Sequence, residues 1–116
     1  MDIETVKARK DLPGTILIDS RSRDRYLGNQ EPIDPIAGSI LGAVNSPWQQ
    51  VSDEVGYFKN LEQQRQLWSD YTQAEEIIVY CGSGVTACVN LLSLHLVGIN
   101  HAQLYPGGWS DWCSYL

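Results

Sequence analysis

Short apolar runs alternate with segments of helical periodicity along this chain. Four of the runs are strand-like in length and composition: Thr15–Ile18, Ala43–Asn45, Ile77–Tyr80 and Ala102–Tyr105. Glycine, proline and polar residues bound these runs, as is typical of strands that end in turns. Because strands that alternate with helices favour a parallel arrangement, the pattern predicts an α/β domain with a mainly parallel sheet flanked by helices.

Two longer segments have the pattern of amphipathic helices. Asn60 followed by Gln63 resembles a capping box and predicts a helix over Leu61–Tyr71. A second helix is predicted over Val85–Val97, with Gly98 at a position that commonly ends helices. Five side chains of this second helix recur at core-like spacing and are expected to face inward: Val85, Cys88, Val89, Leu92 and Leu96.

Length, composition and charge restrict the class of protein. The chain has 116 residues, of which 43% are hydrophobic and 19% charged, as expected for a single domain over residues 1–116. The net charge of −6 argues against nucleic-acid and anionic-membrane binding, both of which need clustered Lys and Arg. The chain has no apolar run of membrane-spanning length and no signal-peptide pattern, so a cytoplasmic protein is expected.

The candidate nucleophile is Cys81, which stands between a predicted strand and a predicted helix. Backbone N–H groups of a glycine-rich loop can converge on its sulfur, and the positive end of the helix points at the same place. Both effects favour the thiolate, which is the reactive form of cysteine. The loop residues expected to surround it are Gly82, Ser83, Gly84, Val85 and Thr86. We expect Cys88 to be a buried packing residue and Cys113 to be partly exposed near the chain end.

A second polar cluster follows the first predicted strand. Asp19, Arg21 and Arg25 come after Thr15–Ile18, as Cys81 comes after Ile77–Tyr80. Because ligands bind beyond the carboxyl ends of parallel strands, one pocket is expected to hold both sets. Arg21 and Arg25 are candidates to bind a small anion, and Asp19 is expected to support the site. This chemistry needs no metal or cofactor.

Four motifs in this order resemble the rhodanese sulfurtransferase domain. They are Ile18–Arg21, Gly38–Ala43, Cys81–Thr86 and Tyr105–Trp109. The resemblance is closest to the catalytic C-terminal domain of tandem-domain thiosulfate and 3-mercaptopyruvate sulfurtransferases. It implies a rhodanese-like fold with a five-stranded sheet. It also implies sulfane-sulfur transfer through a persulfide on Cys81, from a small anionic donor held by Arg25 to cyanide or a thiol. Asp19 and Arg21 are implied to shape the site beneath the loop. A second rhodanese domain is an expected partner if this domain comes from a tandem protein.

Departures from the family pattern leave two questions open. Ser39 and Leu41 replace the histidine and proline usual in the second motif, which keeps a non-catalytic protein-binding module as the alternative function. The stretch Glu31–Pro35 lacks the second arginine of mercaptopyruvate enzymes, and Gly82 and Ser83 lack the charges of animal thiosulfate enzymes. The donor therefore stays open between thiosulfate and 3-mercaptopyruvate. A Cys-x5-Arg phosphatase is disfavoured, because Ala87 stands where its arginine would be.

Overall fold

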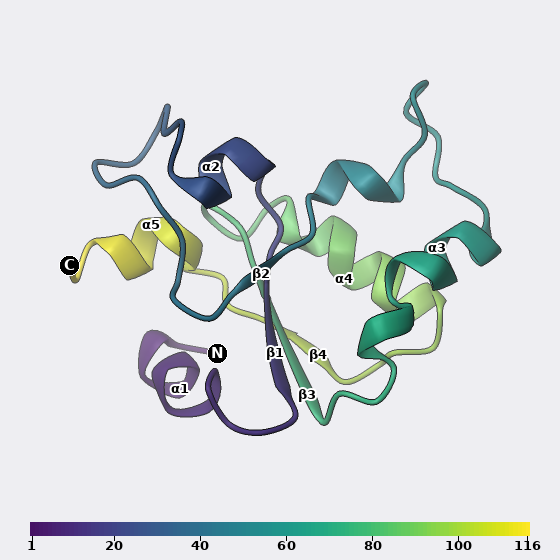
Figure 1. Ribbon diagram of the computed structural model, residues 1–116, viewed down its shortest axis with the longest axis horizontal. Coiled ribbons are helices and arrows are strands. Elements are labelled where there is room, and N and C mark those ends of the chain that lie inside the picture. Colours follow the sequence, from purple (N-terminus) through teal and green to yellow (C-terminus); the bar gives the residue numbers. More distant parts are fainter.

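Four parallel strands form the central sheet of the computed structural model, which describes residues 1–116 (Figure 1). Their order across the sheet is β2-β1-β3-β4, and every neighbouring pair is parallel. The strands are β1 (Thr15–Asp19), β2 (Val44–Asn45), β3 (Glu76–Tyr80) and β4 (Ala102–Leu104). All four strand-like runs of the sequence are thus confirmed as strands. The five-stranded sheet implied by the family resemblance is wrong, since this chain has four strands.

The segment between β2 and α3 does not add a fifth strand. It turns directly into a 3₁₀ helix, η1 (Trp48–Val51), and then makes only an isolated antiparallel bridge between Ser52 and Phe58. The carboxylate of Asp53 accepts hydrogen bonds from the backbone N–H groups of Val55 and Tyr57. These bonds close a tight turn, so the segment folds back on itself instead of extending along the sheet.

Helices cover both faces of the sheet. In Figure 1, α1 (Ile3–Arg9) and α5 (Gly108–Cys113) lie on one side of the strands, and α3 (Leu61–Leu67) and α4 (Ala87–Leu96) lie on the other. The short α2 (Arg23–Leu27) follows β1. No helix is long and apolar enough to span a membrane.

The capping box at the start of α3 is confirmed. The side chain of Asn60 accepts from the N–H of Gln63, and the Gln63 side chain accepts from the N–H of Asn60. The α-helix is shorter than predicted, because it ends at Leu67 and the chain continues as a 3₁₀ turn, η2 (Ser69–Tyr71).

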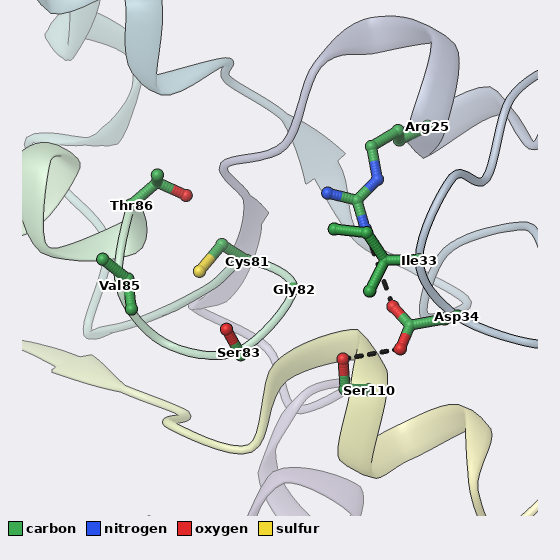
Figure 2. A pocket seen from close by; sticks show the side chains of 9 residues that line it. All are labelled: Arg25, Ile33, Asp34, Cys81, Gly82, Ser83, Val85, Thr86 and Ser110. Atoms are coloured by element: carbon green, nitrogen blue, oxygen red, sulfur yellow. Dashed lines mark hydrogen bonds and ion pairs between the residues drawn. The ribbon is translucent and has the colours of Figure 1, made fainter.

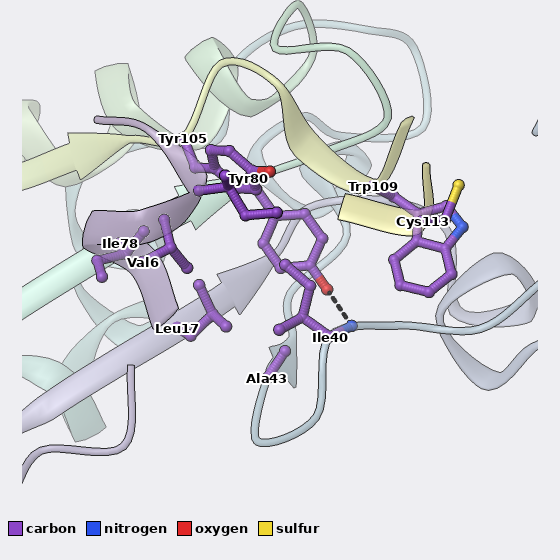
Figure 3. Packing of buried hydrophobic residues seen from close by; sticks show 10 residues of the cluster. Val6, Leu17, Ile40, Ala43, Ile78, Tyr80, Tyr105, Trp109 and Cys113 are labelled. Carbon is purple, nitrogen blue, oxygen red and sulfur yellow. Dashed lines mark hydrogen bonds between the residues drawn. The ribbon is translucent and has the colours of Figure 1, made fainter. Parts of the chain in front are cut away.

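Side chains of β3 alternate between two apolar clusters, one on each face of the sheet. Ile78 and Tyr80 pack with residues of α1 and α5, including Val6 and Trp109 (Figure 3). Ile77 and Val79 pack on the other face, in the cluster that contains Trp68 and residues of α4. Burial on both faces explains why β3 is a continuous apolar run.

Of the five residues predicted to face inward from the helix after Cys81, only Val89 packs against the core, where it is partly buried in the cluster that contains Trp68. Val85 is 73% exposed, and Cys88, Leu92 and Leu96 are also exposed. The buried face instead consists of Ala87, Asn90, Ser93 and Leu94. Periodicity failed here because polar or small residues occupy three of the four buried positions, and several of the large apolar residues are exposed.

Hydrogen bonds explain how polar side chains of α4 are accommodated in the core. The amide of Asn90 donates to the Ser20 hydroxyl and the Ser46 carbonyl, both at 2.8 Å. The hydroxyl of Ser93 accepts from the indole N–H of Trp68 at 2.8 Å and bonds to the Gln64 side chain. Buried polar groups with such partners avoid most of the desolvation penalty.

Two of the three cysteines have the opposite exposure to that expected. Cys88 is exposed, and its Sγ donates to the carbonyl of Gly84 at 3.4 Å. Cys113 is buried, because α5 packs its inner face against the cluster that contains Trp109. Burial, together with the negative charge of Asp34, raises the pKa of the Cys113 thiol.

Candidate active site

A single pocket of about 230 Å³ opens beyond the carboxyl ends of the strands. Figure 2 shows the Cys81 loop on one side and Arg25, Ile33 and Asp34 on the other. The structure therefore brings together the predicted nucleophile and the predicted anion-binding arginine. The residues that line the pocket are Arg25, Ile33, Asp34, Cys81, Gly82, Ser83, Val85, Thr86 and Ser110.

Hydrogen-bond donors surround the sulfur of Cys81. Burial raises the pKa of the thiol, but hydrogen bonds to the sulfur lower it by more, so the pKa lies below its ordinary value. The donors are the Thr86 hydroxyl and the backbone N–H groups of Ala87, Gly84 and Ser83. The N–H of Gly84 lies 3.1 Å from Sγ. This setting favours the thiolate, which is the reactive form of cysteine.

The start of α4 contributes to this setting. Thr86 is the N-cap residue, yet its side chain makes no capping hydrogen bond. Its hydroxyl is thus left for the sulfur, and the N–H of Ala87, the first residue of the helix, donates to the same sulfur. The helix therefore stabilises negative charge at the position of Cys81.

The N-terminus of α5 fixes the shape of the loop. The N–H of Trp109 donates to the carbonyl of Cys81 at 2.8 Å, and the N–H of Ser110 donates to that of Gly82 at 3.0 Å. Gly108 has φ +60°, and a Cβ there would collide with the carbonyl oxygen of Cys81. The close approach explains why the chain has glycine at position 108.

A second glycine lets the loop pass close to the turn before α5. Gly84 has φ +89°, and a Cβ at this position would lie 2.7 Å from the carbonyl oxygen of Pro106. Both the left-handed conformation and the contact exclude larger residues. Gly84 contributes its N–H to the sulfur but does not line the pocket.

Arg25 projects from α2 into the pocket. Its guanidinium lies beside Gly82, where a Cβ would come within 3.5 Å of Nη2. Nη2 also lies 3.1 Å from Glu31 Oε2 and 3.6 Å from Asp34 Oδ2. The Nε–H is buried and has no hydrogen-bond partner. The guanidinium of Arg25 therefore places its positive charge beside the residue that follows Cys81.

Asp19 and Arg21 are buried beneath the pocket and do not line it. The guanidinium of Arg21 binds both carboxylate oxygens of Asp19, and it donates to the carbonyl of Gly38. The hydroxyl of Tyr80 donates to Asp19 at 2.8 Å and accepts from the N–H of Ile40. These contacts join the sheet to the long loop between α2 and β2, so both residues support the site from below.

Three lining residues escaped the sequence prediction: Ile33, Asp34 and Ser110. Ile33 and Asp34 lie in the loop before β2, and Ser110 lies in α5. None carries a local motif, and only the fold brings these segments next to Cys81. The carboxylate of Glu31, which pairs with Arg25 and accepts from the N–H groups of Ile33 and Asp34, was missed for the same reason.

The chain matches known proteins over nearly its whole length. Residues 2–115 match the model of the rhodanese-like domain. The chain belongs to the rhodanese-like domain family. It is 41% identical to a protein of Pseudomonas aeruginosa named "Probable 3-mercaptopyruvate sulfurtransferase", over 97% of this chain and 40% of that protein. It is 37% identical to the thiosulfate sulfurtransferase of Rattus norvegicus, over 83% of this chain and 34% of that protein.

A solved structure supports the same relationship. The 3-mercaptopyruvate sulfurtransferase from Leishmania major superposes with a TM-score of 0.79 and 29% identity, over all of this chain and 33% of that one. The chain thus spans well under half the length of these rhodanese-family relatives, two of which are named for different sulfur donors.

Proposed function

We propose that this rhodanese domain is a sulfurtransferase that carries sulfane sulfur on Cys81. The observation that carries the proposal is the sulfur of Cys81, which lies in the pocket beside Arg25 with a thiol pKa below the ordinary value. The names of the relatives, which include thiosulfate and 3-mercaptopyruvate sulfurtransferases, support the same class of reaction.

The first half-reaction loads the cysteine. The Cys81 thiolate attacks the outer sulfur of a donor such as thiosulfate, a new S–S bond forms, and sulfite leaves with the electron pair of the broken bond. With 3-mercaptopyruvate, the sulfur is transferred in the same way and pyruvate is released after it takes up a proton. Arg25 holds the donor anion through its guanidinium, which lies beside Gly82, and the loop N–H groups stabilise the persulfide.

The second half-reaction regenerates the thiolate. Cyanide or a thiol attacks the terminal sulfur of the persulfide, and Cys81 departs as a thiolate stabilised by the same donors that lower its pKa. Both steps balance with donor and acceptor alone, so no cofactor is proposed. Asp19 and Arg21 serve as positioning residues in this scheme, because neither reaches the pocket.

We also propose that the chain acts as one domain beside a second rhodanese domain. The relatives are more than twice as long as the part this chain matches. Val85, two residues before α4, is exposed, as are Leu92 and Leu96 on the outer face of that helix, and a further domain would cover them. Cys88 is exposed on the same helix.

Intact-protein mass spectrometry tests the proposal. After incubation with thiosulfate or 3-mercaptopyruvate, we expect one added sulfur atom on the peptide that contains Cys81, removable by cyanide. Cys81→Ala should abolish the adduct, whereas the matched variant Cys88→Ala should retain it. An adduct that survives in Cys81→Ala would refute the mechanism.

The alternative function is a protein-binding module without catalysis. Such a module has no need for a thiolate, so Cys81 would alkylate no faster than the exposed Cys88. The sulfurtransferase proposal predicts the reverse order, since Cys81 has several hydrogen-bond donors to its sulfur. Rates of alkylation of the two cysteines, followed by peptide mapping, distinguish the two functions.

A further inference from the structure

Asp34 places a carboxylate in the pocket that the proposed reaction does not use. Its side chain is 8% exposed, and Oδ1 accepts a 2.7 Å hydrogen bond from the Ser110 hydroxyl. Oδ2 lies 3.6 Å from Arg25 Nη2 and has no hydrogen-bond partner. Figure 2 shows Asp34 facing the same space as Arg25 and the Cys81 loop. A fixed negative charge thus lies beside the cation expected to bind the donor.

The charged groups around Arg25 leave no net positive charge to attract an anion. Arg25 is paired with two carboxylates, Glu31 at 3.1 Å and Asp34 at 3.6 Å. The neighbouring cation, Arg21, is already paired with Asp19 at 2.7 Å. This cluster therefore contains three carboxylates and two guanidinium groups, and the Cys81 thiolate adds a further negative charge.

We propose that Asp34 determines which donors the pocket accepts by their charge. The Coulomb energy between a fixed carboxylate and a ligand is proportional to the charge of the ligand. Asp34 therefore penalises a dianion such as thiosulfate about twice as strongly as it penalises a monoanion such as 3-mercaptopyruvate at neutral pH. The pocket favours donors with a single negative charge. This inference rests on the proposed function and names the donor class of the same site.

The substitution Asp34→Asn removes the charge and keeps the shape. The asparagine oxygen can still accept from Ser110, so the loop keeps its hydrogen bond. The second-order rate of persulfide formation should rise about threefold with 3-mercaptopyruvate and about tenfold with thiosulfate, because the second effect is the square of the first. The decisive quantity is the rate with thiosulfate divided by the rate with 3-mercaptopyruvate, compared between Asp34→Asn and the wild type.

Alkylation of Cys81 tests the inference without any sulfur transfer. Iodoacetate carries one negative charge and iodoacetamide carries none, and both react with the thiolate. The ratio of their rates at Cys81 cancels changes in the thiolate fraction and reports only the local potential. We expect Asp34→Asn to raise the iodoacetate-to-iodoacetamide ratio about threefold. Arg25→Gln should lower the same ratio.

Three further variants separate charge from structure. Asp34→Glu and Ser110→Ala retain the carboxylate and should leave the alkylation ratio near that of the wild type. Asp34→Ser supplies a second neutral side chain and should behave as Asp34→Asn does. An unchanged ratio in both neutral variants would overturn the inference, even if both donors load Cys81. A raised ratio without any persulfide would instead refute the sulfurtransferase proposal and retain the role of Asp34 in the local potential.

Discussion

The ion pair between Asp19 and Arg21 supports the pocket wall and is shielded from solvent. Arg21 Nη2 lies 2.7 Å from Asp19 Oδ2, and both side chains are almost completely buried. The same Nη2 donates to the carbonyl of Gly38 at 2.6 Å. Because Gly38 belongs to the loop that carries Asp34, the pair links the end of β1 to one wall of the pocket.

Removing one partner of this pair should strongly destabilise the folded protein. Arg21→Met would leave the Asp19 carboxylate buried without its cation, and we expect the free energy of unfolding to fall by about 3–5 kcal/mol. Urea unfolding followed by circular dichroism measures the loss. The matched control is Arg65→Met, since Arg65 pairs with Glu62 at 3.7 Å on the surface. This variant should lower the free energy of unfolding by less than about 1 kcal/mol. Equal losses for the two variants would contradict the structural role of Arg21.

The hydroxyl of Thr86 should control the titration of Cys81. Its hydrogen bond to the sulfur lowers the pKa of the thiol, so Thr86→Val should shift the pH profile of Cys81 alkylation to higher pH. At pH 6 the alkylation rate of Cys81 in Thr86→Val should be several-fold below that in the wild type. At a pH where Cys81 is ionised in both proteins, the two rates should converge. Ser83→Ala is the control, because residue 83 contributes only its backbone N–H. A profile that moves equally in both variants would exclude a specific role for the Thr86 hydroxyl.

Local patterns in the sequence predicted the strands because the buried runs are short, apolar and bounded by turns. Ile77–Tyr80 faces helices on both sides, so its signal is continuous. The face of α4 could not be predicted in this way. Asn90 and Ser93 are buried through hydrogen bonds to partners distant in the chain, and no periodicity reports such partners.

The candidate site was predictable where one short segment contains the chemistry. Cys81 and its donors come from a single strand–loop–helix connection, and Arg25 follows the neighbouring strand. Asp34 and Ser110 reach the pocket from a long loop and from α5, 76 residues apart in the chain. Their contact depends on tertiary packing, which the sequence does not encode locally.

Gly108 should be more sensitive to substitution than another glycine with positive φ. In Gly108→Ala the new methyl group would meet the carbonyl oxygens of Cys81 and Gly82, in addition to the strain of φ +60°. Gly56 has φ +94° and open space around its Cβ position, so Gly56→Ala carries the strain alone. We expect losses of unfolding free energy of about 1 kcal/mol for Gly56→Ala and of more than about 2 kcal/mol for Gly108→Ala.

The contact between α5 and the loop also gives Gly108→Ala a functional signature. Displacement of the Cys81 carbonyl would move the sulfur away from its N–H donors, so alkylation of Cys81 at neutral pH should slow in the folded protein. Gly56→Ala should leave the alkylation rate unchanged, because residue 56 lies in the turn closed by Asp53. Comparable rates in the two variants would contradict the role assigned to the close approach.

Glu31 should make stability depend on acidic pH. Burial raises the pKa of its carboxyl, but hydrogen bonds from the N–H groups of Asp34 and Ile33, together with Arg25, lower it by more. The pKa in the folded state is therefore below the usual value of 4.5. A group with a depressed folded pKa binds more protons when unfolded, so its contribution is fully present above the unfolded pKa and is lost as pH falls through the folded pKa.

The substitution Glu31→Gln tests this dependence. The gap in unfolding free energy between the wild type and Glu31→Gln should be widest near pH 7 and should narrow as the pH falls below about 4.5. Urea unfolding at a series of pH values measures the gap. Glu62→Gln is the control, because Glu62 is largely exposed in a 3.7 Å pair with Arg65 and should give a small gap. A Glu31→Gln gap that stays constant from pH 7 to pH 3 would show that the carboxylate charge does not stabilise the pocket loop.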